Sequence, residues 1–294
     1  MKILIMGSEG FVGKNLVKGL SEKHDIYTSD QLDSSTHHNY SQCDITNYDS
    51  VEKIVRDVDA VIHLAAHSLV SSLDGSITNA KVNIIGLLNL LESCRKNSIP
   101  KVIFTSASSL VGEPNSFHVN ENHPPKPKTA YGITKLTSEH YLRLYHELYD
   151  IDYTVFRFFN IYGPFQKNGL IPSIFNKIRN NEPITIFGKG DQIRDYVYIE
   201  DVLPFFEQAA SSEIGKNKVL NMGTGNGTTI LEIVKNISEI LEIEPKIEYQ
   251  PIRPGEIGNF VADTTLLHET FGKIPSTDVK IGLSKTIDWL KNNS

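Results

Sequence analysis

The sequence predicts an α/β fold, in which a doubly wound parallel sheet is followed by a smaller, partly interleaved C-terminal lobe. Two observations lead to this prediction. In the first half of the chain, short apolar runs alternate with segments of helical period, and strands separated by helices imply right-handed crossovers between parallel strands. The apolar runs are also continuous, without alternating polar residues, which is typical of strands covered by helices on both faces.

The predicted elements of the first half follow one another regularly. Strands are predicted at 3–6, 25–29, 58–65, 101–106 and 153–159, with a weaker one at 40–43. Helices are predicted at 11–22, 48–55, 79–97 and 130–149. Beyond residue 162, glycine-containing loops become more frequent, as at 188–190 and 223–227. We therefore expect a first domain over 1–162 and a second lobe mainly over 163–294, with some segments returning to the first domain.

Composition narrows the class of protein. The chain has 294 residues, of which 39% are hydrophobic and 22% charged, and its net charge is -6. This composition excludes a disordered tail, and the acidic balance gives no reason to expect binding to nucleic acid or to an anionic membrane. No window approaches the ~20 apolar residues of a membrane span. Cys43 and Cys94 form neither a disulfide framework nor a metal-ligand spacing, so we expect a cytoplasmic protein.

A glycine-rich loop joins the first predicted strand to the first predicted helix. Gly7, Gly10 and Gly13 enclose Phe11 and Val12 in this loop. Glycine permits a tight turn, close approach of the backbone to a pyrophosphate, and close packing of the helix on the sheet. The helix N-terminus adds unpaired N–H groups and a positive dipole end. An ordinary glycine turn is the alternative, but the strand–loop–helix context favours a Rossmann-type dinucleotide-binding domain.

Acidic residues follow the next two strands. Asp30 ends the second strand, at about the distance from the glycine loop that is usual for a ribose-binding carboxylate. A carboxylate there accepts hydrogen bonds from the adenosine ribose hydroxyls and repels a 2′-phosphate, which favours NAD over NADP. Asp44 and Ile45 would bracket the adenine. The alternative for Asp30 is a solvated acid at the end of a strand.

A tyrosine and a lysine begin the predicted helix at 130–149. The spacing of Tyr131 and Lys135 puts both side chains on one helix face. The pKa of a phenol, ordinarily near 10, is too high for an efficient base at neutral pH. We expect the neighbouring ammonium group to favour the phenolate and so to make Tyr131 a general base. Two exposed helix residues are the alternative meaning of this common pattern.

At this point the chain resembles the extended short-chain dehydrogenase/reductase family, in its nucleotide-sugar epimerase/dehydratase branch. The resemblance runs nearly end to end. It implies cofactor contacts by Leu64, Ala65, Ala66 and Asn83, and a homodimer formed through paired helices. The motifs that carry it are the glycine loop, Asp30, Asp44-Ile45, His63-Leu-Ala-Ala66, Asn83, Tyr131 with Lys135, Arg157-Phe-Phe-Asn160-Ile-Tyr-Gly-Pro164, Gly190-Asp-Gln-Ile-Arg194-Asp-Tyr-Val197, Asn221-Met-Gly223, Arg253-Pro-Gly-Glu256 and Ala262-Asp263.

The resemblance also implies a nucleoside-diphosphate-sugar site in the second half. Arg194 and Arg253 carry fixed positive charge with paired donors, which suits a diphosphate, and Asn160 donates to the same oxygens. Phe187 corresponds to the family residue that lies against the uracil. Phe260 corresponds to a position that limits space around the C2 substituent of the sugar. The alternatives are a local ion pair for Arg194, an exposed loop charge for Arg253 and a core residue for Phe260.

One departure from the family concerns the loop after the strand at 101–106. The family has serine or threonine five residues before the glycine that closes this loop, and here Ala107 stands five residues before Gly112. Either Ser108 supplies the missing hydroxyl, or Tyr131 works alone more slowly, or the family's chemistry is lost. The Thr-Asp-Glu sequence of 4,6-dehydratases is absent, which disfavours dehydration.

The function expected from the sequence is therefore NAD-dependent 4-epimerisation of a UDP-sugar, most simply UDP-glucose and UDP-galactose, through a transient 4-keto sugar. A nucleotide-sugar 4-ketoreductase would share most of these motifs but would consume reduced cofactor. A non-catalytic NAD-binding regulatory protein is the third possibility, because of Ala107. The histidines at 63, 67, 118 and 123 lie on separate predicted elements, so no metal site is expected.

Overall fold

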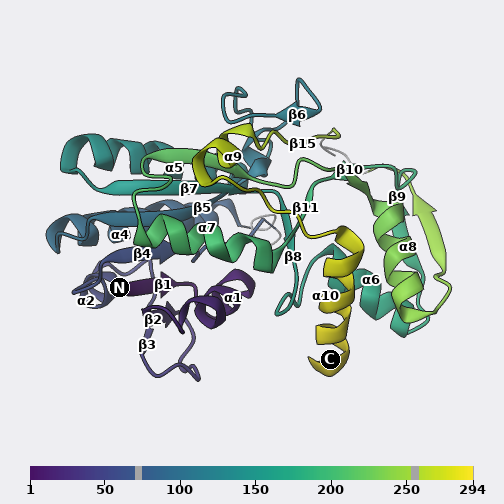
Figure 1. Cartoon of the computed structure of the whole chain (residues 1–294), viewed down its shortest axis with the longest axis horizontal. Helices are drawn as coiled ribbons and strands as arrows, with labels where there is room; N and C mark the ends of the chain where they lie inside the picture. Colours follow the sequence, from purple (N-terminus) through teal and green to yellow (C-terminus); the bar gives the residue numbers. More distant parts are fainter. Residues whose placement is uncertain (70–74, 253–257, 294) are drawn as a thin grey trace.

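A seven-stranded parallel sheet forms the centre of the first domain in the computed structural model, which describes residues 1–69, 75–252 and 258–293 (Figure 1). The strand order is β12-β7-β5-β4-β1-β2-β3, and every pairing in this sheet is parallel. The strands are β1 (Lys2–Met6), β2 (Asp25–Asp30), β3 (Tyr40–Gln42), β4 (Ala60–His63), β5 (Lys101–Ala107), β7 (Asp152–Phe158) and β12 (Lys218–Met222). The predicted doubly wound α/β fold is confirmed.

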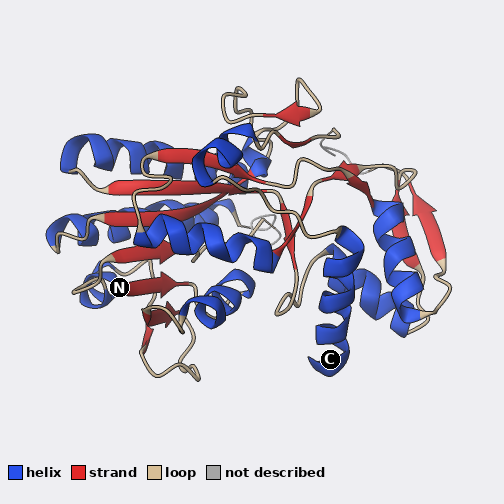
Figure 2. Ribbon diagram, viewed as in Figure 1, coloured by secondary structure: helices blue, strands red, loops and turns tan. Residues whose placement is uncertain are grey.

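Helices cover both faces of this sheet, which explains the continuous apolar runs (Figure 2). Side chains alternate between faces along a strand, so Ile3 and Ile5 of β1 join one buried cluster, while Leu4 and Met6 join the other. The first cluster includes residues of α1 (Phe11–Leu20) and α7 (Ile199–Ser211). The second includes residues of α2 (Tyr48–Ile54), α4 (Gly86–Lys96) and α5 (Ala130–Tyr149). The central strand β1 is thus apolar on both sides.

Two of the predicted helices show how local signals set helix ends. The α5 helix has the predicted bounds: Thr129 caps its first turn by accepting from the Gly132 N–H, and Asp150 ends it in a left-handed conformation at φ 56. The helix predicted at 79–97 is instead built from α3 (Ser76–Ala80), a π-helical turn at Lys81–Ile85, and α4. A π-turn inserts an extra residue and rotates the faces on either side of it.

The second lobe is a small α/β layer, seen at the right of Figure 1. Its strands β9 (Ile184–Phe187) and β14 (Ile247–Gln250) pair in parallel, and α6 (Leu170–Arg179), α8 (Ile230–Leu241) and α10 (Val279–Asn293) accompany them. The short elements are η3 (Ser108–Leu110), β6 (His118–Val119), β8 (Asn160–Tyr162), β10 (Ile193–Arg194), β11 (Tyr196–Tyr198), β13 (Thr228–Thr229), β15 (Val261–Ala262) and α9 (Thr265–Phe271). Although α7 and β12 follow residue 162, they pack in or on the large sheet. The domain boundary at 162 stays a prediction.

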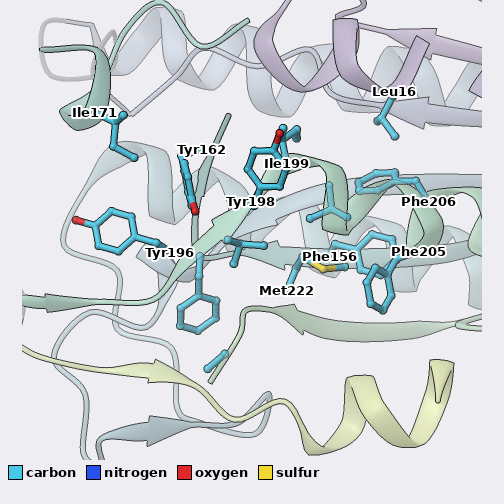
Figure 3. Packing of buried hydrophobic residues seen from close by; sticks show 14 of the residues in the cluster. Leu16, Phe156, Tyr162, Ile171, Tyr196, Tyr198, Ile199, Phe205, Phe206 and Met222 are labelled. Atoms are coloured by element: carbon cyan, nitrogen blue, oxygen red, sulfur yellow. The ribbon is translucent and has the colours of Figure 1, made fainter. Parts of the chain in front are cut away.

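An aromatic cluster joins the two lobes (Figure 3). Tyr162 and Tyr198 come from the paired strands β8 and β11, and their ring centroids lie 5.8 Å apart. The Tyr162 hydroxyl donates to the Val279 carbonyl at 3.2 Å, and a Cβ on Gly282 would come within 2.2 Å of that hydroxyl oxygen. Glycine at 282 therefore lets α10 lie directly on this cluster. Tyr162 also forms part of a cavity wall, so the cluster supports the site described below.

Within the described parts of the chain, none of the helices combines the length and the apolar character that crossing a bilayer requires.

Candidate functional site

A cavity of about 670 Å³ opens at the carboxyl ends of the sheet strands, between the two lobes. Ligands of open α/β sheets bind at this edge. A smaller cavity of about 360 Å³ shares part of its wall, including Gly7, Gly10 and Leu64, and extends along β2. Together the two cavities bring together these residues predicted from the sequence: Gly7, Gly10, Phe11, Val12, Gly13, Asp30, Asp44, Ile45, Leu64, Ala65, Ala66, Ser108, Tyr131, Lys135, Asn160 and Arg194.

The backbone of the glycine loop is packed too closely for a side chain at Gly7 or Gly13. A Cβ on Gly7, where φ is 86, would lie 2.7 Å from the Ala65 nitrogen, and one on Gly13 would lie 2.3 Å from the Gly7 carbonyl oxygen. Gly10 precedes α1, and no side chain of the described residues caps the first turn of that helix. The first turn also holds no acidic residue. The loop therefore presents a bare helix N-terminus, which suits a pyrophosphate.

Backbone amides hold the carboxylate of Asp30 at the adenosine end. Its two oxygens accept hydrogen bonds from the Glu9 N–H at 3.1 Å and the Gln31 N–H at 2.8 Å. Asp44 accepts from the Thr46 N–H at 2.9 Å and from the Thr46 hydroxyl at 2.8 Å. Both carboxylates line the smaller cavity, as expected for groups that contact adenosine.

Asn83 lies behind the cavity wall, not on it. Its side-chain oxygen accepts from the His67 N–H at 2.8 Å, and its amide nitrogen donates to the Thr134 hydroxyl at 3.1 Å. The residue sits in the π-helical turn and is buried. These contacts join the segment that follows β4 to helix α5, so Asn83 positions the wall of the site. A direct cofactor contact by Asn83 stays a prediction.

Burial dominates the electrostatics of the tyrosine–lysine pair. Lys135 is buried, and burial lowers its pKa to about 7, although the charge of Glu139 partly opposes this. Its ammonium nitrogen lies 5.5 Å from the Tyr131 ring centre and 4.5 Å from that of Phe104. Burial likewise raises the pKa of Tyr131 to about 12. Desolvation of the phenolate is the cause of this rise, and the expected help of Lys135 to the phenolate stays a prediction.

The serines after β5 have different surroundings. The Ser106 hydroxyl donates to Glu139 Oε1 at 2.6 Å, and Arg157 binds both oxygens of the same carboxylate at 3.0 and 2.7 Å. The Ser106 hydroxyl is thus already used in a buried hydrogen-bond network with Glu139 and Arg157. Ser108 and Ser109 both line the large cavity, and the Ser109 hydroxyl is buried without a hydrogen-bond partner among the described residues.

Ser109, and Glu9 of the smaller cavity, are among the cavity residues that the sequence analysis did not assign to the site. The run of serines around Ala107 was the available signal for Ser109. For Glu9 the signal was a charged residue inside a glycine loop.

Asn160 and Arg194 meet at the far end of the large cavity. Asn160 donates to the Asp195 carbonyl at 3.2 Å, and Arg194 donates to the Ile193 carbonyl at 2.7 Å. The Asp195 carboxylate is fully buried and accepts four hydrogen bonds, from the Thr224 N–H and hydroxyl and from the N–H groups of Gly225 and Ala262. Asp195 thereby ties the strand that carries Arg194 to the loop after β12 and to β15.

The other predicted substrate residues are distributed differently. Phe187 lines an adjoining cavity of about 510 Å³ that shares Gly169 and Leu170 with the large one. Phe260 is buried in the core, where its ring packs edge-on against Phe159 at 5.7 Å; Phe159 lines the large cavity and Phe260 does not. Arg253 lies outside the described residues.

No three histidine, cysteine, aspartate or glutamate side chains within residues 1–69, 75–252 and 258–293 cluster closely enough to hold a metal ion.

A parallel sheet with a glycine loop after β1, an acidic residue at the end of β2 and a Tyr–Lys pair in the same site is typical of the dinucleotide-binding α/β class. The family model described as "NAD dependent epimerase/dehydratase family" matches residues 3–223. A putative UDP-glucose 4-epimerase of Methanocaldococcus jannaschii is 35% identical, with 99% of each chain covered.

Solved structures agree. UDP-glucose 4-epimerase of Thermotoga maritima, with UDP-glucose, superposes with a TM-score of 0.92 at 32% identity, over 100% of this chain and 99% of that one. UDP-N-acetylglucosamine 4-epimerase of Methanobrevibacter ruminantium, with UDP-N-acetylmuramic acid, superposes with a TM-score of 0.92 at 30% identity and the same coverage. The chain belongs to the NAD-dependent epimerase/dehydratase family, and NAD is its cofactor.

Proposed function

We propose that this protein is a UDP-sugar 4-epimerase that interconverts UDP-glucose and UDP-galactose. One observation carries the proposal: Tyr131 and Lys135 share a cavity with the diphosphate-type donors Asn160 and Arg194, and the glycine loop lines the same cavity. The residues proposed for acid–base chemistry, for the diphosphate and for the cofactor therefore line the same cavity. The names of the similar proteins support the reaction class, since three of those compared act, by name, as 4-epimerases of UDP-sugars.

In the proposed mechanism, Tyr131 Oη removes the proton from the C4 hydroxyl of the sugar and later returns it. The chemistry that NAD supplies when bound is reversible acceptance of the C4 hydride. Arg194 and Asn160 hold the diphosphate, so that the 4-keto sugar can turn about this anchor and present its other face. Burial of the Tyr131 phenol means that a nearby positive charge must lower its pKa in the loaded site.

Lys135 is placed to supply part of that charge. In the structure without cofactor, its nitrogen donates to the Thr105 carbonyl at 2.7 Å, which holds the amine beside the phenol. Its pKa of about 7 means that both protonation states are populated near neutral pH. A negatively charged nucleotide in the cavity favours the protonated form, and a protonated Lys135 in turn favours the Tyr131 phenolate.

The choice of a plain hexose rests on Phe260. The Phe260 ring packs behind Phe159, which lines the cavity. With that ring in place, Phe159 cannot move away from the cavity to make room for a larger sugar substituent. Overfilling a packed wall costs about 1–3 kcal/mol. We therefore propose that an N-acetyl group at C2 is disfavoured relative to a hydroxyl.

We also propose that the protein is a homodimer. Apolar side chains are exposed along α5 and the neighbouring α3 and π-turn, with Ile77 75% and Leu148 59% exposed. Ile85, Ile133 and Leu144 extend the same surface. A second copy of the chain would cover it by helix pairing. Sedimentation of the wild type and of Leu148→Glu tests this: we expect a dimer that the variant weakens, and a wild-type monomer at micromolar concentration would contradict it.

The experiment that tests the function is incubation of the purified protein with a panel of UDP-sugars, followed by chromatographic separation of the products. We expect UDP-galactose to form from UDP-glucose, and the reverse, without net change in absorbance at the NADH band. Net oxidation of added NADH by a 4-keto sugar nucleotide, without epimerisation, would instead identify a 4-ketoreductase. Absence of both reactions on every sugar would indicate a non-catalytic protein.

A further inference from the structure

Glu9 stands inside the glycine loop, next to the ribose-binding carboxylate. Its backbone N–H donates to Asp30 Oδ2 at 3.1 Å, so the two residues are direct neighbours. Both line the smaller cavity at the adenosine end of the site. The reasoning from sequence assigned the choice between NAD and NADP to Asp30 alone.

Three side chains contact the Glu9 carboxylate and hold it in position. The Ser35 hydroxyl donates to Oε1 at 2.6 Å, Lys14 Nζ lies 3.2 Å from Oε2, and His37 Nε2 lies 3.8 Å from Oε1. Burial opposes ionisation, but the Ser35 hydrogen bond and the charges of Lys14 and His37 outweigh it, so the pKa of Glu9 lies below its ordinary value. Glu9 is therefore an anion with a defined orientation.

The surroundings of this corner are negative. Asp30, Glu9 and Asp33 all act on the Tyr40 phenol, whose pKa is raised by burial and then by these three charges. Two basic side chains lie beside Glu9: Lys14, in the first turns of α1, and His37, in the segment between β2 and β3. A 2′-phosphate on the adenosine ribose would need such groups as partners, and Glu9 already contacts both.

We propose that Glu9 is a second determinant of cofactor selectivity, which excludes the 2′-phosphate of NADP in two ways. Its carboxylate adds a second negative charge to the cavity that Asp30 lines, and its contacts with Lys14 and His37 withhold these side chains from a phosphate. Like charges brought together at a binding site are strongly unfavourable. Replacement of Asp30 alone is therefore insufficient to admit NADP. The inference concerns the cofactor, so its test does not depend on which sugar is turned over.

The test measures binding to the full-length protein after bound nucleotide has been removed. Isothermal titration gives the dissociation constants of NAD and NADP, and of 5′-AMP and 2′,5′-ADP as probes of the adenosine end alone. The variants are Glu9→Gln, Asp30→Ser and their combination. Glu244→Gln, which removes an exposed carboxylate in the second lobe, controls for the change in net charge.

We expect Glu9→Gln to raise the affinity for NADP relative to NAD by about tenfold or more, the effect of relieving one like-charge contact. The combination should exceed Asp30→Ser by a similar factor, 2′,5′-ADP should show the same trend, and Glu244→Gln should show none. Adding Lys14→Met to Glu9→Gln should remove most of the gain; a gain that persists would overturn the part assigned to Lys14.

Two results would overturn the proposal as a whole. The first is an NADP-to-NAD affinity ratio that Glu9→Gln leaves unchanged in both the wild-type and the Asp30→Ser backgrounds. The second is an equal loss of affinity for all four nucleotides, which would mean that Glu9 only supports the fold of the loop. Thermal unfolding of each variant, measured alongside, separates loss of fold from loss of selectivity.

Discussion

The Lys135 ammonium nitrogen lies 5.5 Å from the centre of the Tyr131 ring, while its hydrogen bond goes to the Thr105 carbonyl at 2.7 Å. The side chains of Tyr131 and Lys135 are thus adjacent, and the Thr105 carbonyl fixes the position of the amine. Burial raises the pKa of Tyr131 to about 12 and lowers that of Lys135 to about 7, so both groups are pushed toward their neutral forms. The proposed role of Tyr131 as a base therefore requires a positive charge close to its phenol.

Removing the phenol hydroxyl tests its role as the acid–base group. We expect Tyr131→Phe to keep the fold and to bind NAD, and to lose epimerisation by at least about 100-fold, the usual scale of general acid–base catalysis. The measurement is the initial rate of UDP-galactose formation, with the NAD content of the protein determined alongside. Turnover close to that of the wild type would remove Tyr131 from this role.

Burial of Lys135 predicts a pH dependence of stability. The pKa of this amine is about 7 in the folded protein, below its ordinary value of 10.5. Between these values the unfolded chain binds a proton that the folded chain does not, so the free energy of unfolding rises with pH across this window. Glu139, which favours the ammonium form, limits the effect.

The comparison of wild type with Lys135→Met, by thermal unfolding from pH 6 to pH 10 without cofactor, checks this. We expect the melting temperature of the wild type to increase relative to that of the variant as the pH rises from about 7 towards 10. A difference that stays constant over the whole range would mean that the amine is not desolvated. Saturating NAD should reduce the trend, because the nucleotide favours the protonated amine.

The loop after β5 offers a test of which hydroxyl replaces the one missing at Ala107. If Ser108 supplies it, Ser108→Ala should reduce kcat severely, and Ala107→Ser should change little. If no residue supplies it, Ala107→Ser should raise kcat, and Ser108→Ala should have little effect.

Ser109→Ala completes that series, because the unpartnered Ser109 hydroxyl lines the same cavity. All three variants change one small side chain and serve as controls for one another. Full activity in all three variants would contradict the hypothesis that a serine hydroxyl in this loop takes part in the reaction.

Substitution of Phe260 tests the space around the sugar. We expect the wild type to prefer UDP-glucose to UDP-GlcNAc, and Phe260→Ser to raise kcat/KM for UDP-GlcNAc relative to UDP-glucose, because Phe159 gains room to move. Loss of a buried phenyl ring also lowers stability, by about 3–5 kcal/mol for truncation to alanine. Phe260→Leu is the milder variant to compare. Comparable wild-type rates on the two sugars would contradict the proposed restriction and leave epimerisation itself untouched.

Local patterns in the sequence were sufficient for much of the fold. The α5 helix begins and ends where its period and its flanking residues predict, and β1 is followed directly by the glycine loop. Asp30, Tyr131 and Lys135 were found because each lies at a fixed distance from such a local signal. These features depend on residues close together in the chain, and short-range periodicity and turn chemistry report on them directly.

Only the tertiary structure decided how those residues behave. Spacing predicted that Lys135 faces Tyr131, but the desolvation that sets both pKa values comes from packing of distant segments. Ser106 is occupied by Glu139, which is 33 positions away, and Glu9 meets Ser35 across 26 positions. Phe260 lies in the core because the segment just before β15 packs against Phe159. Burial and long-range pairing are properties of the folded chain, and for that reason no pattern in one segment could specify them.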